Sequence, residues 1–487
     1  MRRATTNAIL NENHFYLHYQ YWGTQMRNRI IGLAVVICLG LAGCEGDDGA
    51  TGAAGATGAT GPAGPSGTPL AVTRDDAIKT NANIAYAVYS DSYLTAIEMR
   101  TALQALVDAP SQANFDAAKA AWLASREPYG QSEVYRFRVG PIDALLPDGS
   151  IGQEGDGPEG SINAWPLGES LIDYVAAAVD GDADPEIPNS TAGIAGNVIA
   201  DQTITITTAT VRDNSELGGD ERNVTSGYHA IEFLLWGQDL NADLSGTGTR
   251  DATGGQRPVS DYQTGGACTS GIGNGQADVI CERRGQYLLA AADVLIEDLL
   301  TVVDAWNPNG TNNHYAAFVA GGDVSLAKIL EGMGRLGFGE LAGERMNIAL
   351  LTNSQEDEHS CFSENTHRDI LLNAKGIQNA FRGEYTRIDG EVLSGAGIDD
   401  LLLAEGFVES ANAYRAALEN TMIRISTIDQ AAKAGMPFDT QIQMGITEPN
   451  ISGSIQALSA QTDVLETVIT DLGVTVGDIR QDTEEEI

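Results

Sequence analysis

The most chemically informative stretch of the chain covers residues 227–237 and holds one imidazole and one carboxylate, those of His229 and Glu232. Apolar residues recur in it at helical spacing, so the sequence predicts a short buried helix bounded by glycines. Side chains three residues apart share one face of a helix, with Cβ atoms about 5–6 Å apart. Both side chains can therefore reach one metal ion.

Two interpretations of this pair remain open. An unpaired carboxylate buried among apolar side chains is costly, so it takes up a proton or finds a partner. A metal ion bound by His229 and Glu232 would supply that partner. A direct hydrogen bond between the two side chains would do so equally well.

A second group of metal-capable side chains lies in the other half of the chain. Residues 354–367 contain two Glu-x-x-His pairs, Glu356 with His359 and Glu364 with His367. Helices of ferritin-like bundles present metal ligands at this spacing. Imidazole together with carboxylates suits iron, zinc or manganese, and the spacing does not choose among them. The alternative is a polar surface turn between two helices.

Long helices are expected to position these groups. Ala-rich helical patterns cover 75–107 and 111–137, and helical patterns return from Glu282 to about Leu472. The one convincing strand signal covers 203–208, which is too little for a sheet. The sequence therefore predicts an all-α fold of two helical bundles joined by a loop-rich segment.

The second of these helical patterns carries polar side chains where an ordinary bundle helix has leucine. Pro128 lies among them and is expected to kink or interrupt the helix. The polar side chains concerned are those of Arg126, Tyr129, Glu133 and Arg136.

The N-terminal residues indicate export and a lipid anchor. Arginines precede the apolar run 30–41, and small residues lead to Cys44, as in a bacterial secretion signal. The run is shorter than the roughly 20 residues that a membrane-spanning helix needs. Residues 41–44, Leu-Ala-Gly-Cys, resemble the lipobox of bacterial lipoproteins, which implies lipidation of Cys44 and removal of residues 1–43. Residues 1–25 look like an overextended start, because Met26 would begin a conventional signal.

The residues after Cys44 bear on location. Glu45, in place of aspartate, favours the outer membrane over the inner one and leaves both the periplasmic and the surface face open. Over 45–70 glycine recurs every third residue, which predicts a flexible stalk rather than a collagen trimer.

The rest of the chain, about 415 residues, is too long for one core and suits two domains. After the signal (1–44) and the stalk, the predicted parts are an N-terminal bundle over 71–245 that carries the H-x-x-E motif, a loop segment over 246–281, a C-terminal bundle over 282–480 and an acidic tail over 481–487.

The charge composition of the chain limits the classes of partner that it can bind. The chain has 67 acidic and 28 basic residues, a formal net charge of −39. Nucleic-acid-binding surfaces are basic, so this charge argues against a nucleic-acid partner. It is compatible with cation binding. Since an exported chain can form disulfides, and Cys268 and Cys281 flank a Gly-rich loop, we expect these two cysteines to pair.

The segment 227–232 resembles the G-x-H-x-x-E signature of the imelysin family, which includes the insulin-cleaving metalloprotease imelysin and the iron-regulated protein A-like lipoproteins. Three further stretches are similar to the family in the same order, namely 126–143, 162–167 and 355–363. The run Gln-Glu-Asp-Glu-His-Ser-Cys-Phe in the last of them is closer to the iron-regulated protein A-like branch. The resemblance covers about 75–475.

The resemblance implies an all-α protein of two related bundles, exported by Gram-negative bacteria, with its site between the bundles around the H-x-x-E residues. On the matching positions these are His229 and Glu232, as metal ligands. Further candidate ligands are Glu133, Glu356 and His359, and candidate pocket residues are Arg126, Tyr129, Arg136 and Asp143.

Three functional hypotheses follow. The first, favoured by the branch resemblance and the acidic composition, is a cell-envelope lipoprotein that binds iron, zinc or a metal complex. The second is a zinc-type metallopeptidase of the imelysin type that acts on a protein or peptide through Glu232. It lacks the H-E-x-x-H arrangement of zincins. The third is a non-enzymatic module that binds a protein partner.

Overall fold

The structure is a computed structural model, and it describes residues 72–165, 167–175, 197–217, 223–239, 250, 252–268, 276–355 and 357–480. These residues fall within one compact unit. Several sequence predictions concern residues outside this set: the signal, Cys44, the stalk, Glu356 and the acidic tail.

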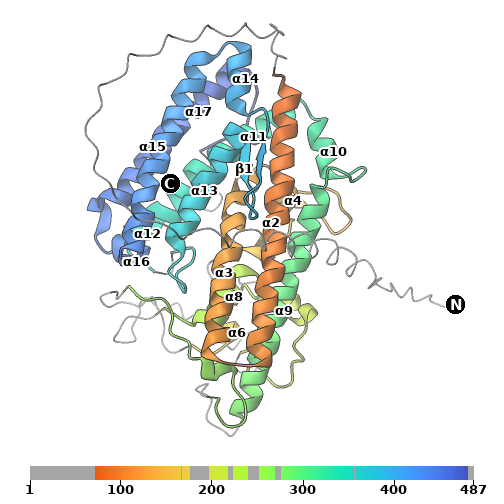
Figure 1. Ribbon diagram of the computed structural model, residues 1–487, viewed down its shortest axis with the longest axis vertical. Helices are drawn as coiled ribbons and strands as arrows, with labels where there is room; N and C mark the ends of the chain where they lie inside the picture. The colour runs from red at the N-terminus through yellow and green to blue at the C-terminus, as the bar shows by residue number, and fades with distance from the viewer. Residues whose placement is uncertain are drawn as a thin grey trace, which may run out of the picture. The chain divides into compact units, whose positions relative to one another are not determined.

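The described part of the chain is mainly helical (Figure 1), which confirms the all-α class. The longer helices are α2 (Arg74–Asp108), α3 (Gln112–Ser132), α8 (Gly227–Trp236), α9 (Ala277–Ala305), α11 (Asp323–Arg335), α13 (Thr366–Arg382), α15 (Val408–Lys433) and α17 (Pro449–Leu472). A π-helical segment, η4 (Leu336–Ile348), follows α11 directly.

Short elements connect the long helices. The short α-helices are α4 (Pro141–Ala144), α5 (Glu159–Ile162), α6 (Glu169–Ile172), α7 (Thr208–Asp213), α10 (His314–Val319), α12 (Ala349–Thr352), α14 (Ile398–Glu405) and α16 (Phe438–Ile442). The 3₁₀ turns are η1 (Glu133–Tyr135), η3 (Val259–Tyr262) and η5 (Gly445–Thr447). The strands found in the described residues, β1 (Glu384–Thr386) and β2 (Val392–Ser394), form one antiparallel hairpin.

The predicted strand at 203–208 is wrong. The carboxylate of Asp201 accepts the backbone N–H of Thr203 at 2.9 Å, and Thr207 Oγ1 accepts the backbone N–H of Thr210 at 3.1 Å. Aspartate and threonine make such local bonds readily in turns and helix caps. The segment is therefore a turn that leads into the N-terminus of α7.

The two long N-terminal helices lie where the apolar pattern predicted them. Thr73 caps α2 through a capping box with Asp76, and Ser111 Oγ accepts the N–H of Asn114 at the start of α3. The helix α3 continues through Pro128 to Ser132, so the proline does not interrupt it.

The long helices pack in two groups that share a boundary. In Figure 1, α2, α3 and α9 run side by side, and α15 packs against α17 on the other side. The helix α9, which the sequence analysis assigned mainly to the second bundle, packs against α2 and α8. Between the groups, α13 packs against α3, where a Cβ on Gly376 would lie 2.6 Å from the Gln131 carbonyl oxygen. The division into two domains stays a prediction.

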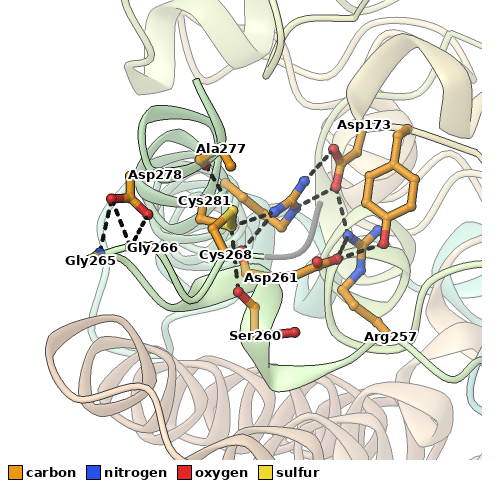
Figure 2. Close-up of a disulfide and its surroundings, with 12 residues drawn as sticks. Asp173, Arg257, Ser260, Asp261, Gly265, Gly266, Cys268, Ala277, Asp278 and Cys281 are labelled. Atoms are coloured by element: carbon orange, nitrogen blue, oxygen red, sulfur yellow. Dashed lines mark hydrogen bonds and ion pairs between the residues drawn. A yellow bond between two sulfur atoms is a disulfide. The ribbon is translucent and has the colours of Figure 1, made fainter. Parts of the chain in front are cut away.

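Two further features bear on the predicted location and on the export of the chain. Among the described helices, none combines the length and the apolarity needed to cross a lipid bilayer. Cys268 and Cys281 form a disulfide, with Cα atoms 6.1 Å apart, which is the pairing that we expected (Figure 2).

A buried ionic network lies beside the disulfide (Figure 2), and we call it the Asp173 cluster. Its members are Asp173, Arg257, Asp261 and Arg284. Asp173 accepts bonds from Arg257 Nη1 at 2.8 Å and from Arg284 Nε and Nη2 at 2.6 and 2.9 Å. Burial alone would raise the pKa of Asp173, but the two guanidinium charges lower it to about 2.

Candidate functional site

The helix α8 is buried along its whole length, and this requires a glycine at its start. Gly227 has a φ of +81°, which L-residues with a side chain rarely adopt. A Cβ there would lie 2.4 Å from the Ile162 carbonyl oxygen. The glycine of the G-x-H-x-x-E motif thus lets α8 start against the backbone of α5.

Aromatic side chains of α3 fix the position of α8. Trp122 Nε1 donates to the Tyr228 carbonyl oxygen at 2.9 Å, and its ring centroid lies 5.4 Å from that of Trp236. The rings of Tyr129 and Tyr228 lie 4.8 Å apart. These contacts bury large apolar areas and leave α8 little freedom to shift or rotate.

The first histidine–carboxylate pair of the site lies on α8. His229 and Glu232 are both fully buried, and His229 Nδ1 lies 2.8 Å from Glu232 Oε2. The other carboxylate oxygen, Oε1, accepts the backbone N–H of Ser363 at 2.9 Å and its hydroxyl at 2.6 Å. His229 Nε2 is buried and has no hydrogen-bond partner in the residues that the structure describes.

The surroundings favour the uncharged forms of this pair. Burial, and then the neighbouring His359 and Arg126, hold the pKa of His229 well below its usual value. Burial raises the pKa of Glu232 to about 8, although the Ser363 hydroxyl and Arg126 oppose that rise. A cation at Nε2 would need the lone pair of that nitrogen, so it would favour the tautomer in which Nδ1–H donates to an ionised Glu232.

A second histidine–carboxylate pair faces the first. The ring of His359 lies edge-on to that of His229, with centroids 4.6 Å apart. His359 Nδ1 lies 3.2 Å from Asp369 Oδ2, and Nε2 lies 3.2 Å from the Asn163 amide nitrogen. Burial and the charge of Arg345 lower the pKa of His359 to about 3. The site therefore contains two buried neutral imidazoles, each with a carboxylate at Nδ1.

Guanidinium groups surround the second pair. Arg126 donates to Asp369 Oδ1 from Nη2 at 2.9 Å, and both Arg126 and Arg345 have a nitrogen 3.4 Å from His359 Nδ1. Burial opposes ionisation of Asp369, but the charge of Arg126 and the bonds from His359 and Ser360 keep its pKa well below the usual range.

A further ionic layer extends from Arg345. This residue donates to Glu340 Oε1 at 2.8 Å and to Glu133 Oε2 at 3.2 Å. Arg136 lies 3.9 Å from Glu133, 3.7 Å from Asp143 and 3.6 Å from Glu340 in the same layer. Burial raises the pKa of Asp143 well above its usual value even beside Arg136.

The structure brings most of the candidate residues together. Arg126, Glu133, His229, Glu232 and His359 belong to one buried network, and Arg136 and Asp143 to its outer layer. Tyr129 is fully buried and contributes its ring: the Arg126 guanidinium carbon lies 5.3 Å from the ring centroid. These residues lie on or next to α3, η1, α4 and α8 and in the loop before α13, so they come from both halves of the chain.

Some residues of the candidate site could not be assigned a role from the sequence. Asn163 and Ser363 were noticed within motifs but received no role, and Asp369 was overlooked. Glu340 and Arg345 lie on η4, and a π-helix has no spacing that can be read from one sequence. Such helices are rare and occur often at functional sites.

The donors fit a metal ion bound through imidazole. Neutral imidazoles suit iron and zinc, and a carboxylate at Nδ1 is the usual way to orient such a ligand. Because both oxygens of Glu232 are engaged, this residue would orient His229. A group of three His, Cys, Asp or Glu ligand atoms within 4.8 Å of one another does not occur around His229 in the described residues. The one such group that the described residues contain is formed by Asp239, Glu364 and Asp439. A metal at His229 would therefore bring further ligands of its own.

Comparisons with known proteins agree with this architecture. The sequence profile of the imelysin family (peptidase M75) matches residues 85–465. The chain therefore belongs to the imelysin family. No curated protein matches it in sequence.

The solved structures that are similar to this chain include two bacterial proteins. One is described as a "putative iron-regulated protein A precursor" from Parabacteroides distasonis, with 16% identity, a TM-score of 0.52 and coverage of 83% of this chain and 97% of that one. The other is an imelysin-like protein from Psychrobacter arcticum, with 12% identity, a TM-score of 0.48 and coverage of 83% and 98%. At such identity the first likeness establishes the fold alone.

Proposed function

We propose that the protein is a metal-binding lipoprotein of the cell envelope that binds iron, or alternatively zinc, at His229. One observation carries this proposal: His229 is fully buried, its Nδ1 is held by Glu232, and its Nε2 has no partner among the described residues. A buried polar nitrogen without a partner is costly, so a bound group at that position would remove the cost.

Within this proposal, His229 Nε2 binds the metal and Glu232 is a positioning residue. His359 lies beside His229 and supplies a second neutral imidazole, whose Nδ1 is held by Asp369. The bound ion would act as a Lewis acid toward any oxygen ligand that it carries. Arg126 and Arg345, both close to His359, favour a metal that arrives with an anionic ligand.

The choice of iron rests on comparison and composition. The Parabacteroides distasonis protein is described as iron-regulated, and imidazole nitrogen is a common ligand of iron. The acidic composition, with 67 acidic residues against 28 basic ones, would attract cations.

The test is elemental analysis of the purified full-length protein after loading with Fe²⁺ or Zn²⁺ and removal of unbound metal. We expect close to one metal ion per chain, and loss of it in His229→Ala. The matched control is His314→Ala, because the His314 ring packs against Trp306, away from His229. Equal metal content in wild type and His229→Ala would contradict the proposal.

The envelope location rests on the sequence around Cys44. A basic segment, a short apolar run and Leu-Ala-Gly-Cys support lipidation of this cysteine and anchoring in the outer membrane. Mass spectrometry of the mature N-terminus should find a diacylglycerol-modified Cys44. The variant Cys44→Ser should leave the membrane fraction, and a membrane-bound Cys44→Ser protein would argue against the anchor.

A second candidate, a metallopeptidase, is supported by the family description as a peptidase. In that case Glu232 would orient His229, and a metal held by His229 would supply the activated water. Cleavage of an unfolded protein substrate should then disappear on chelation and in Glu232→Gln. Cleavage that survives both treatments would exclude the site as its source.

A further inference from the structure

A cluster of carboxylates includes Glu364 of the loop 353–365, the loop that also brings His359 and Ser363 to the His229 site. Asp239 follows α8, Glu364 precedes α13, and Asp439 lies on α16. One carboxylate oxygen from each of the three lies within 4.8 Å of the others. Asp239 and Asp439 are only 6% and 2% exposed, so the cluster is not a set of solvated surface acids.

A fourth carboxylate, that of Glu358, is buried beside these three. Glu358 is 0% exposed, and neither of its oxygens has a hydrogen-bond partner of good geometry in the described ranges. Its carboxyl interacts electrostatically with Asp439 and Asp239, so it lies beside the cluster. Both oxygens of Glu364 are likewise buried without a hydrogen bond among the described residues.

The charges of this region are poorly balanced. Arg250 is the basic residue that interacts with Glu358 and Glu364, and its guanidinium donates to the backbone oxygens of Asp439 and Asn353 at 2.7 and 2.6 Å. Burial, followed by neighbouring carboxylates, raises the pKa of both glutamates well above the usual range, although Arg250 opposes the rise. Gln355 Nε2 donates to Asp239 Oδ2 at 2.7 Å, but among the described residues four carboxylates beside one guanidinium still need additional positive charge or protons.

We propose that Asp239, Glu358, Glu364 and Asp439 form a binding site for a hard divalent cation, with Ca²⁺ as the best fit. An all-carboxylate donor set suits calcium, magnesium and manganese, whereas the imidazoles of the His229 site suit softer metals. Calcium binds oxygens at about 2.3–2.6 Å, so oxygens on opposite sides of one ion can lie about 5 Å apart. The 4.8 Å limit on the three oxygen separations agrees with that span.

The cation would organise the loop that serves the His229 site. Glu358 and Glu364 belong to this loop. Their sequence neighbours His359 and Ser363 contact His229 and Glu232 of α8. A cation that holds the two glutamates would therefore hold the histidine and the serine in place. The cation site goes beyond the proposed function and does not depend on it.

The experiment is calorimetric titration of CaCl₂ into the full-length protein after removal of metals with a chelator. We expect one site, with a Kd below about 1 mM. The affinity should fall at least tenfold in Glu358→Gln and in Asp439→Asn. The control Glu98→Gln changes an exposed glutamate of α2 and should bind as wild type does. No binding by wild type at about 1 mM, or equal affinity in wild type and both site variants, would overturn the proposal.

Thermal unfolding separates loss of the site from loss of the fold. In chelator, Glu358→Gln should melt at or above the wild-type temperature, because it removes one of four mutually repelling carboxylates. Calcium should raise the Tm of wild type and of His229→Ala, and it should raise that of Glu358→Gln by less. A Glu358→Gln protein that melts below wild type in chelator, or that calcium stabilises as much as wild type, would overturn the proposal.

Discussion

Two buried clusters of this protein offset the cost of burying a carboxylate in different ways. In the Asp173 cluster, two guanidinium groups surround the carboxylate of Asp173 (Figure 2), and the pKa of that carboxyl falls to about 2. At the His229 site the pKa of Glu232 rises to about 8 and that of the histidine falls. The Asp173 cluster stabilises its ions, whereas the surroundings of the His229–Glu232 pair favour the neutral forms of both side chains.

The difference separates a structural network from a candidate binding site. Asp173 has charged partners for both oxygens, so nothing further is needed there. His229 has an oriented Nδ1 and an Nε2 that lacks a partner in the described residues. Burial of a charged or polar group is thus no sign of function in itself, and an unused donor or acceptor is the more informative feature.

The largest effect should follow removal of the structural carboxylate. In Asp173→Ala, the buried Arg257 and Arg284 lose the carboxylate that they share, while Asp261 still contacts Arg257, and loss of one member of a buried ion pair costs about 3–5 kcal/mol. Urea unfolding should show this loss, and it should not depend on added metal. The control Glu98→Ala should stay within about 0.5 kcal/mol of wild type. A small loss in Asp173→Ala would mean that the two clusters do not differ as described.

The pH dependence should distinguish the clusters next. Because the folded pKa of Glu232 is raised from 4.5 to about 8, its contribution to stability is fully present below pH 4.5 and is lost as the pH rises to 8. Over the full range from pH 4.5 to 8 this rise in pKa corresponds to a free energy on the order of 5 kcal/mol. The difference in urea-unfolding free energy between metal-free wild type and Glu232→Gln should therefore decrease across this range. A difference that does not change with pH would refute the raised pKa.

Asp173 should show the opposite dependence. Its folded pKa is lowered from 3.8 to about 2, so its contribution is present above pH 3.8 and is lost as the pH falls to 2. Acid unfolding curves of wild type and Asp173→Asn should converge in this range. Curves that stay equally far apart from pH 4 to 2 would contradict the assignment.

Metal should stabilise one cluster and leave the other unaffected. At 100 times the Kd, a bound metal adds about 2.7 kcal/mol to the free energy of unfolding. Zn²⁺ should therefore raise the Tm of wild type but not that of His229→Ala. For Glu232→Gln we expect a smaller rise, because the loss of an orienting carboxylate typically weakens metal binding about 10–100-fold. An identical rise in wild type and His229→Ala would place the metal elsewhere.

The smallest effect should come from Ser363→Ala. This change removes the hydroxyl that donates to Glu232 Oε1 at 2.6 Å and keeps the backbone N–H bond at 2.9 Å. We expect a loss of about 1 kcal/mol and a further rise in the pKa of Glu232. The rise in the pKa of Glu232 should shift the pH dependence of the unfolding free energy, measured as described for Glu232→Gln, to higher pH. An unshifted profile would mean that the hydroxyl does not act on this carboxyl.

The sequence predicted what periodicity and local chemistry determine. The helices α2 and α3 follow long apolar patterns with Thr73 and Ser111 as caps, and α8 lies within the predicted segment. The threonines of 203–208 misled the prediction, because β-branched residues favour strands in general, but here they bond locally in a turn.

The partners of the site were less predictable. Asp369 meets Arg126 because α13 packs against α3, and Arg345 reaches the site from a π-helix. A single sequence, taken by itself, contains no record of such long-range contacts. His229, Glu232 and His359 were found because histidine is rare in this chain, so each instance could be weighed separately.

The most direct test of the account is to locate the metal. Crystals of the protein soaked in Zn²⁺ or Fe²⁺ should show an anomalous-scattering peak about 2.0–2.2 Å from His229 Nε2, with Glu232 still bonded to Nδ1. A map that shows the metal at the carboxylates of Asp239, Glu364 and Asp439 but no peak at His229 would contradict the central claim. His229 and Glu232 would then be a structural pair.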